Sequence, residues 1–282
     1  KTLNLINQKF GSIPKPTRVI EKNWTIEPTQ DGERQVTIRR VGDSQYAMAG
    51  YHIPPTSHPD FPAVYVMSRI LADTPSGRLY KNLVETKKAS SVFSQLLQNK
   101  EPSYTIFAAE LGKDASIDAA RDALIQTIEN FTQTPPSKEE VERFKAAALK
   151  NIELSFNEPN SIALQMTNWV AVGDWKLLFV YRDRLRKVTA EDVQKAAQKY
   201  LLQSNRTLGI FVPTEKPVRA EVPKVSDEEI AAMTKDVKGG EAIAAGEVFD
   251  PNPTNIESRT KRGQIGGIKT AYLSKKNRGE SV

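Results

Sequence analysis

Five short stretches of the chain carry patterns typical of β-strands. In 34–41, Val36, Ile38 and Arg40 fall on alternate positions and so share one face. Gly42-Asp43-Ser44 separates this stretch from the next, which predicts a hairpin between the two. Two further strand-like stretches, 91–98 and 104–111, are joined by a turn at 99–102, which predicts a second pair. A last strand ends just before Pro213. The predicted strands are 34–41, 46–53, 91–98, 104–111 and 206–212.

Apolar residues spaced three and four apart predict the helices between these strands. Ser137 and Glu140 form a capping box at the start of one helix, and Thr189 with Asp192 marks another. Asp60 and Ser76 are candidate caps of two earlier helices. The predicted helices are 60–72, a short one through Leu79, Leu83 and Val84, one after Asp114 ending near Phe131, 137–156, one through Leu164 to Trp169, and 189–201.

Paired strands alternating with blocks of helices predict an α+β domain, in which helices pack on one face of a mainly antiparallel sheet. This domain is expected to span residues 20–213. Residues 1–19 are interpreted as the end of a preceding domain and a connector, because 3–10 has the pattern of a helix tail and the chain starts at Lys1. We therefore expect an excised fragment. Residues 214–282 are interpreted as a linker toward a following half, with a short helix at 227–237 and a hairpin that includes 268–273.

Composition narrows the classes of function. The 282 residues include 40 Lys and Arg and 34 Asp and Glu, giving a net charge of +6, with 39% hydrophobic residues. The basic residues occur as scattered pairs, so no nucleic-acid partner is expected. No apolar run approaches the roughly 20 residues of a membrane-spanning helix. The absence of cysteine excludes disulfides, thiol catalysis and cysteine-based metal sites.

Few residues qualify as catalytic or metal-ligating groups. The only histidines, His52 and His58, are six residues apart across a proline-rich loop, which does not fit the usual spacing of zinc ligands. Ser76 is more typical of a helix cap than of a nucleophile. Acidic pairs occur only in first helical turns, where they favour the helix dipole. We therefore predict no catalytic, cofactor-binding or metal-binding residue in this chain.

Two further patterns carry no function on their own. The glycine pairs at 239–240 and 266–267 lack the surroundings of a phosphate-binding loop. The N-x-T sequons at Asn23, Asn130 and Asn205 are relevant only in a secreted eukaryotic protein.

Residues 73–94, DTPSGRLYKNLVETKKASSVFS, resemble a segment of the M16 family of zinc metallopeptidases, which includes pitrilysin and the mitochondrial processing peptidase. The junction Tyr51-His52-Ile53-Pro54 followed by His58-Pro59-Asp60 is similar to a strand-to-helix junction of bacterial members. Residues 189–201 and 206–213 resemble the family's penultimate helix and final strand. The order of these segments also agrees with the family.

The resemblance implies a parent protein whose two halves close around a peptide. In that parent a zinc ion held by an inverted His-x-x-Glu-His helix activates the attacking water. No such motif occurs in this chain, so the resemblance assigns it to the second, non-catalytic domain of the first half. Its implied partners are the parent's zinc-bearing domain, the second half and the peptide substrate. Zinc is implied only for the parent, and the bacterial periplasm is the favoured compartment.

A second residue comparison supports a non-catalytic role. The family uses an Arg and a Tyr seven residues apart to hold substrate and stabilise the oxyanion, and these positions align with Val84 and Ser91. Neither residue type is present. Two alternatives stay open from the sequence: an M16-like domain of a non-enzymatic structural or partner subunit, and an unrelated peptide- or nucleic-acid-binding domain.

Overall fold

The computed structural model describes residues 1–282 except 20, 22–26, 238–245 and 278–282. The chain divides into two compact units, Lys1–Val218 and Arg219–Val282. The domain limits expected at 19/20 and 213/214 stay a prediction, and residue 20 lies outside the described part. Among the helices of the described residues, none has the length and apolar character needed to cross a bilayer.

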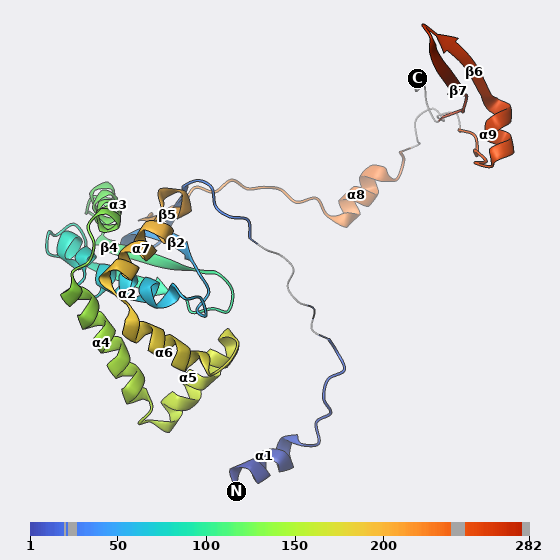
Figure 1. Cartoon of the computed structure of the whole chain (residues 1–282). Helices are drawn as coiled ribbons and strands as arrows, with labels where there is room; N and C mark the ends of the chain where they lie inside the picture. The colour runs from blue at the N-terminus through green and yellow to red at the C-terminus, as the bar shows by residue number, and fades with distance from the viewer. Residues whose placement is uncertain (20, 22–26, 238–245, 278–282) are drawn as a thin grey trace. The chain divides into compact units, whose positions relative to one another are not determined.

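The described residues of the first unit form five strands and seven α-helices (Figure 1). The strands are β1 (Arg34–Arg40), β2 (Ser44–Ile53), β3 (Ser91–Leu96), β4 (Ser103–Gly112) and β5 (Arg206–Pro213). The helices are α1 (Thr2–Phe10), α2 (Phe61–Ala72), α3 (Ile117–Gln133), α4 (Lys138–Ser155), α5 (Pro159–Val172), α6 (Leu177–Lys187) and α7 (Ala190–Tyr200). Two short turns complete it, the π-helical η1 (Tyr80–Val84) and the 3-10 turn η2 (Gln203–Asn205).

The strands form one sheet in the order β1-β5-β2-β4-β3. Only β1 and β5 run parallel, and the other neighbours are antiparallel. Helices α2, α3 and α7 pack on one face of this sheet, and α4 and α6 pack in turn on α2. The predicted α+β fold, with a mainly antiparallel sheet and helices on one face, is confirmed.

The predicted hairpin between the first two strands is wrong, because β5 lies between β1 and β2. Val36 of β1 is opposite Gly209, and Gly209 is also opposite Met48 of β2. The physical reason is burial: Leu208 and Ile210 of β5 are buried, whereas all seven residues of β1 are exposed. A strand with a buried face gains most in the centre of a sheet, so β1 is left as an edge.

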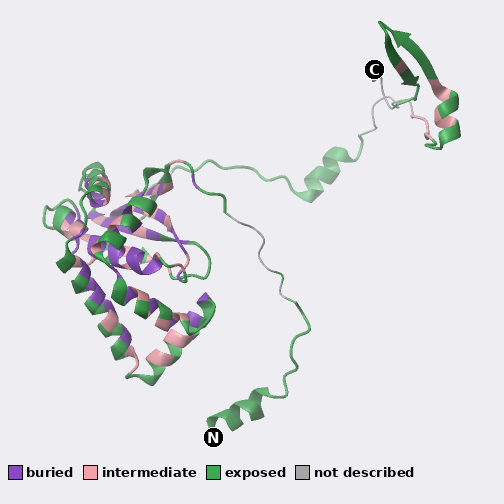
Figure 2. Ribbon diagram, in the orientation of Figure 1, coloured by how far each residue is buried: buried purple, intermediate pink, exposed green. Residues whose placement is uncertain are grey.

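The core lies between the sheet and its helices (Figure 2). Along β2 every second residue is buried, beginning at Gln45, and the alternation runs to the end of the strand. The most deeply buried large side chains include Phe61 of α2, Phe107 of β4 and Phe131 of α3. Successive side chains of a strand point to opposite faces, so the remaining positions of β2 must face away from the helices.

The helix starts agree with two of the four capping signals, those at Ser137 and Thr189. The Ser137 hydroxyl accepts a hydrogen bond from the Glu140 N–H at 3.1 Å, and the Glu140 carboxylate accepts one from the Ser137 N–H at 2.8 Å. Thr189 and Asp192 form the same reciprocal pair. Asp60 precedes α2 but caps nothing, because its carboxylate accepts hydrogen bonds from Lys199 and Tyr200 of α7 instead.

Two helices were not expected from the sequence. Helix α6 follows α5 closely, and Gly173, with φ of +147°, ends α5 in a conformation that favours glycine. The short helix α9 (Pro253–Arg259) belongs to the second unit. The predicted helix through Leu79, Leu83 and Val84 is present as η1, but the Ser76 side chain does not cap it.

Gly77 and Arg78 hold the turn between α2 and η1. A Cβ at Gly77 would lie 2.5 Å from the Asp73 carbonyl oxygen and 2.9 Å from that of Leu71, so only glycine fits. The Arg78 guanidinium binds the Glu140 carboxylate through Nε at 3.1 Å and Nη2 at 2.9 Å. It also lies 4.6 Å from the centre of the Phe131 ring. The turn is thereby attached to the α3–α4 junction.

The second unit contains α8 (Asp227–Thr234), α9 and a hairpin of β6 (Thr260–Ile265) and β7 (Ile268–Leu273). Helix α8 is three residues shorter than expected, and the predicted strand 268–273 is confirmed. All of α8 is exposed, and so are Ile265, Ile268 and Tyr272 of the hairpin. Part of the predicted glycine-rich linker, 238–245, lies outside the described residues.

We predict that Gly77→Ala lowers the free energy of unfolding by about 1–3 kcal/mol, because the added methyl group overlaps the backbone of residues 71–73. Gly112→Ala is the matched control, since a Cβ there meets nothing within 4 Å. Urea denaturation followed by circular dichroism measures both. Equal stabilities of the two variants would contradict the prediction.

We also predict that limited proteolysis removes residues 214–282 before it cuts inside 34–213. The described residues between 214 and 237 are almost all exposed and make few contacts that would resist a protease. Mass spectrometry of a trypsin time course identifies the first sites. First cuts within β2 or β4 would show that the tail is the better protected part.

Candidate functional site

The two histidines have separate protein partners. His52, at the end of β2, has Nδ1 3.0 Å from Asn205 Oδ1 and Nε2 3.5 Å from Glu27 Oε1. His58, in the loop before α2, accepts a hydrogen bond from the Asp60 N–H at 3.1 Å. No group of three His, Asp or Glu side chains in the described part of the chain is able to hold a metal ion. These residues do not fit a zinc site, so we derive no zinc-dependent step within this chain.

The other residues considered from the sequence have structural positions. Val84 packs against the core at the end of η1. The Ser91 hydroxyl donates a hydrogen bond to Glu110 Oε2 across the β3–β4 pair at 3.2 Å. The Asn205 amide donates to the carbonyls of His52 and Tyr200, at 3.0 and 2.8 Å. Asn23, the first sequon, lies outside the described residues.

The face of the sheet opposite the helices is a functional candidate, and we call it the open face. Four large apolar side chains on it are between two fifths and one half exposed: Val36 47%, Ile38 41%, Phe93 42% and Tyr104 44%. Within the described residues of this unit no helix packs on it. Register and burial assign to it Arg34, Val36, Ile38, Arg40, Ser44, Tyr46, Met48, Gly50, His52, Ser91, Phe93, Gln95, Tyr104, Ile106, Ala108, Glu110, Thr207, Gly209 and Phe211.

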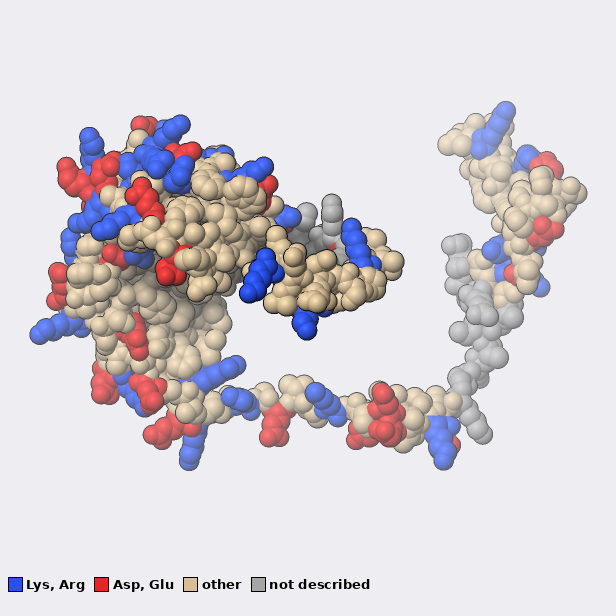
Figure 3. Space-filling model, turned by 90° about the horizontal axis from the view of Figure 1, so that it is seen from below, with Lys and Arg blue, Asp and Glu red and all other residues tan. Residues whose placement is uncertain are grey.

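An apolar surface of this kind is typical of a site that contacts another polypeptide. Figure 3 shows Lys and Arg intermixed with Asp and Glu over the folded part, next to broad uncharged areas. The open face combines these apolar side chains with polar ones, such as Ser91 and Gln95 of β3, and its Lys, Arg, Asp and Glu side chains are Arg34, Arg40 and Glu110.

A hollow of about 350 Å³ lies in the middle of the open face. Gly50 of β2 and Gly209 of β5 line it, together with the side chains of Met48, Tyr104 and Ile106. Arg34, His52 and Glu27 also line it, near the ends of β1 and β2. Sequence reasoning missed this feature. Glycine inside a strand was the available signal, but the two glycines become neighbours only through the β2–β5 register.

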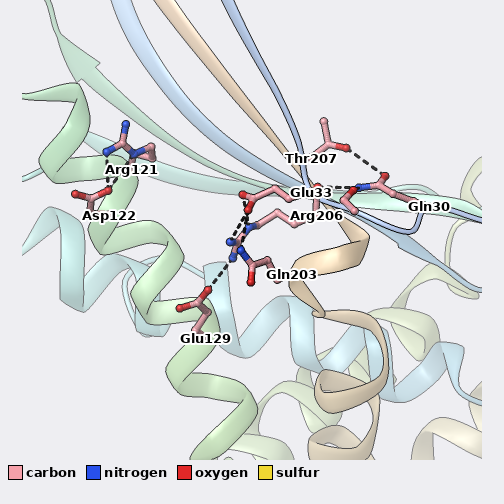
Figure 4. A network of polar contacts seen from close by, with 9 residues as sticks. Gln30, Glu33, Arg121, Asp122, Glu129, Gln203, Arg206 and Thr207 are labelled. Atoms are coloured by element: carbon pink, nitrogen blue, oxygen red, sulfur yellow. Dashed lines mark hydrogen bonds and ion pairs between the residues drawn. The ribbon is translucent and has the colours of Figure 1, made fainter.

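A buried arginine fixes the chain that leads into β1 (Figure 4). Arg206, with a side chain 5% exposed, donates Nε to Glu33 Oε1 and Nη1 to Glu129 Oε1 of α3, both at 3.0 Å. The Gln30 amide donates to the Arg206 carbonyl at 2.8 Å. This network ties residues 30–33 to β5 and to α3, so it sets where β1 enters the sheet.

The charges of this network stabilise one another. The hydrogen bonds from Arg206 lower the pKa of Glu33, although burial works in the opposite direction. Burial also works against the charged form of Arg206, but Glu33 and Glu129 outweigh it and raise its pKa. Nearby, burial raises the pKa of Tyr51 to about 12.

Comparison with known families decides what kind of domain this is. Residues 1–148, just over half of the chain, match the family described as the peptidase M16 inactive domain. The chain belongs to this family. The resemblance seen in residues 73–94 is thereby confirmed, and the M16 domain is of the inactive type.

Solved and curated relatives agree with this assignment. The inactive peptidase domain of a candidate zinc protease from Bordetella parapertussis is 40% identical, with a TM-score of 0.58, over 66% of this chain and 99% of that one. The zinc protease PqqE of Helicobacter pylori is 22% identical over 76% of this chain. The periplasmic protease PqqL of Escherichia coli shares the fold, with 17% identity and a TM-score of 0.59, over 76% of this chain and 24% of that one.

This chain spans only part of the two longer relatives. It spans about half the length of PqqE, at 49%, and a smaller share of PqqL. The activities of PqqE and PqqL are therefore properties of those longer proteins.

We predict that Glu33→Gln lowers the free energy of unfolding at pH 7 by about 1 kcal/mol, because a hydrogen bond to a charged group is lost but solvent screens the partly exposed carboxylate. Because the pKa of Glu33 is lowered by folding, its contribution is complete above the ordinary glutamate pKa of about 4.3 and disappears as the pH falls through the folded pKa. Urea denaturation from pH 7 to pH 3 measures both effects.

The control is Glu191→Gln, which removes an exposed ion pair with Lys195 and is expected to cost at most about 0.5 kcal/mol. If wild type and Glu33→Gln differ by the same amount at pH 3 as at pH 7, the proposed role of the charge is wrong.

Proposed function

We propose that this chain is a non-catalytic wall and support domain of a zinc-dependent metalloendopeptidase of the M16 family. The open face is the observation that carries the proposal. Helices cover one face of the sheet and bury it in the core. The other face is uncovered, and its apolar side chains suit contact with another polypeptide. An extended peptide presents alternate side chains to one side and is therefore able to place apolar side chains on such a surface.

The proposed partners are the parent's zinc-bearing domain, the second half of the parent and the peptide substrate. The parent's zinc supplies a Lewis acid and an activated water for attack on the peptide carbonyl. This chain would contribute a rigid surface on which the substrate rests and a fixed entry point, held by Arg206, for the chain arriving from the zinc-bearing domain. The periplasm is the proposed compartment, supported by the description of PqqL as a periplasmic protease.

The experiment separates support from catalysis. We predict that the 282-residue chain, incubated with zinc and then dialysed, holds no stoichiometric zinc by mass spectrometry and leaves a quenched-fluorescence peptide library intact. Adding the zinc-bearing domain from the same gene is expected to produce cleavage that neither part gives alone. One equivalent of tightly held zinc, or cleavage by this chain alone, would contradict the proposal.

The identity of the parent has its own test. Sequencing the coding DNA upstream of Lys1 shows whether a His-x-x-Glu-His motif with a downstream glutamate is encoded there. Replacement of those residues in an otherwise M16-like domain, with no separate zinc-bearing subunit, would overturn the proposal in favour of a non-enzymatic partner protein.

A further inference from the structure

The two glycines of the hollow have no structural explanation in the fold itself. Neither Gly50 nor Gly209 has a positive φ. A Cβ at Gly50 would lie 3.8 Å from Ile106 Cγ1, and a Cβ at Gly209 would lie 3.7 Å from Met48 Cβ, which are ordinary contact distances. Glycine inside a strand weakens it relative to alanine. Glycine therefore occupies two neighbouring positions, 50 and 209, at which an alanine side chain would fit.

The bare backbone forms the floor of a space with apolar walls. Register places Gly50 opposite Thr207 and Gly209 opposite Met48, so the two glycines are diagonal neighbours in the centre of the sheet. Met48, Ile106 and Tyr104 surround them. Close approach of a ligand to the backbone is a recognised reason for glycine in a strand. A large apolar side chain fits a space of this size and lining.

One end of the hollow carries a free positive charge. Arg34 lines it and has no ion pair among the described residues. Glu27, the carboxylate that lines the hollow in the part of the chain described by the structure, lies 3.5 Å from His52 Nε2. The guanidinium of Arg34 is therefore left for a carboxylate of the ligand.

We propose that the hollow is a subsite for one large apolar side chain of an extended peptide, with an acidic residue of the same peptide bound by Arg34. The inference rests on the proposed function, in which the open face contacts substrate, and adds the sequence preference of that contact. In an extended peptide, side chains two residues apart lie on the same side, so the acidic residue is expected two positions from the apolar one.

The test uses the full 282-residue chain and a fluorescein-labelled decapeptide of Gly and Ser that contains Glu-Ser-Leu-Ser-Glu. Anisotropy and amide chemical shifts are expected to show saturable binding, with shifts centred on β2 and β5. The double variant Gly50→Ala/Gly209→Ala is expected to weaken binding at least about tenfold, the factor that one lost apolar contact typically gives, with an unchanged or higher Tm. Gly112→Ala, which adds a methyl group in open space, is the matched control and is expected to bind like wild type.

A second variant tests the charge. Arg34→Gln is expected to weaken binding of the glutamate peptide several-fold and to leave unchanged the binding of a peptide with Gln in both glutamate positions. Absence of saturable binding, or equal binding by wild type and the double alanine variant, overturns the inference. Concentration-dependent dimerisation that the double variant abolishes would identify a second copy of this chain as the occupant and overturn it as well.

Failure of this inference and failure of the proposed function give different results. If the chain restores cleavage with the zinc-bearing domain but does not bind the peptide, only the subsite is wrong. If it binds the peptide but never supports cleavage, the proposed function is wrong while the subsite remains a property of the open face.

Discussion

The sheet depends on β5 pairing with β1 on one side and β2 on the other. Without β5, the two strands that begin the domain have no contact with each other, and β1 has no partner at all among the described strands. The Arg206 network stands at the first residue of β5 and also fixes residues 30–33. One buried guanidinium therefore connects the beginning of the domain, its last strand and α3.

The unequal faces of the sheet connect this architecture with function. On the helix side, every second residue of β2 and most alternate residues of β5 are buried in the core. The residues between them form a surface that no helix covers among the described residues of this unit. In the proposed function, this M16 inactive domain contributes through its surfaces and not through a catalytic group. The open face carries apolar side chains with arginines near both ends of β1, and the proposed contact with another polypeptide rests on these features.

Local sequence patterns predicted the strands and the capped helices well, because alternation and capping boxes depend on nearby residues. They failed on strand order, since alternation shows that a strand has a buried side but not which strand lies beside it. Asp60 had the position of a cap, but the cation and phenol that bind it come from α7, far along the chain. The hollow was missed for the same reason. A single glycine in a strand predicts no cavity, and Gly50 and Gly209 line one only because the β2–β5 register brings them together. Helix α6 was missed because its start at Lys176 has no side-chain cap to signal it.

The position of β5 also determines when the domain is able to form during synthesis. A chain growing from its N-terminus presents β2 long before residues 206–213 exist, and the edge that β5 will occupy is a row of unpaired backbone groups in the meantime. Such an edge is a template for pairing with another chain. The nascent protein is therefore most exposed to aggregation in the interval before its last strand emerges, and a product that stops short of β5 keeps that open edge permanently.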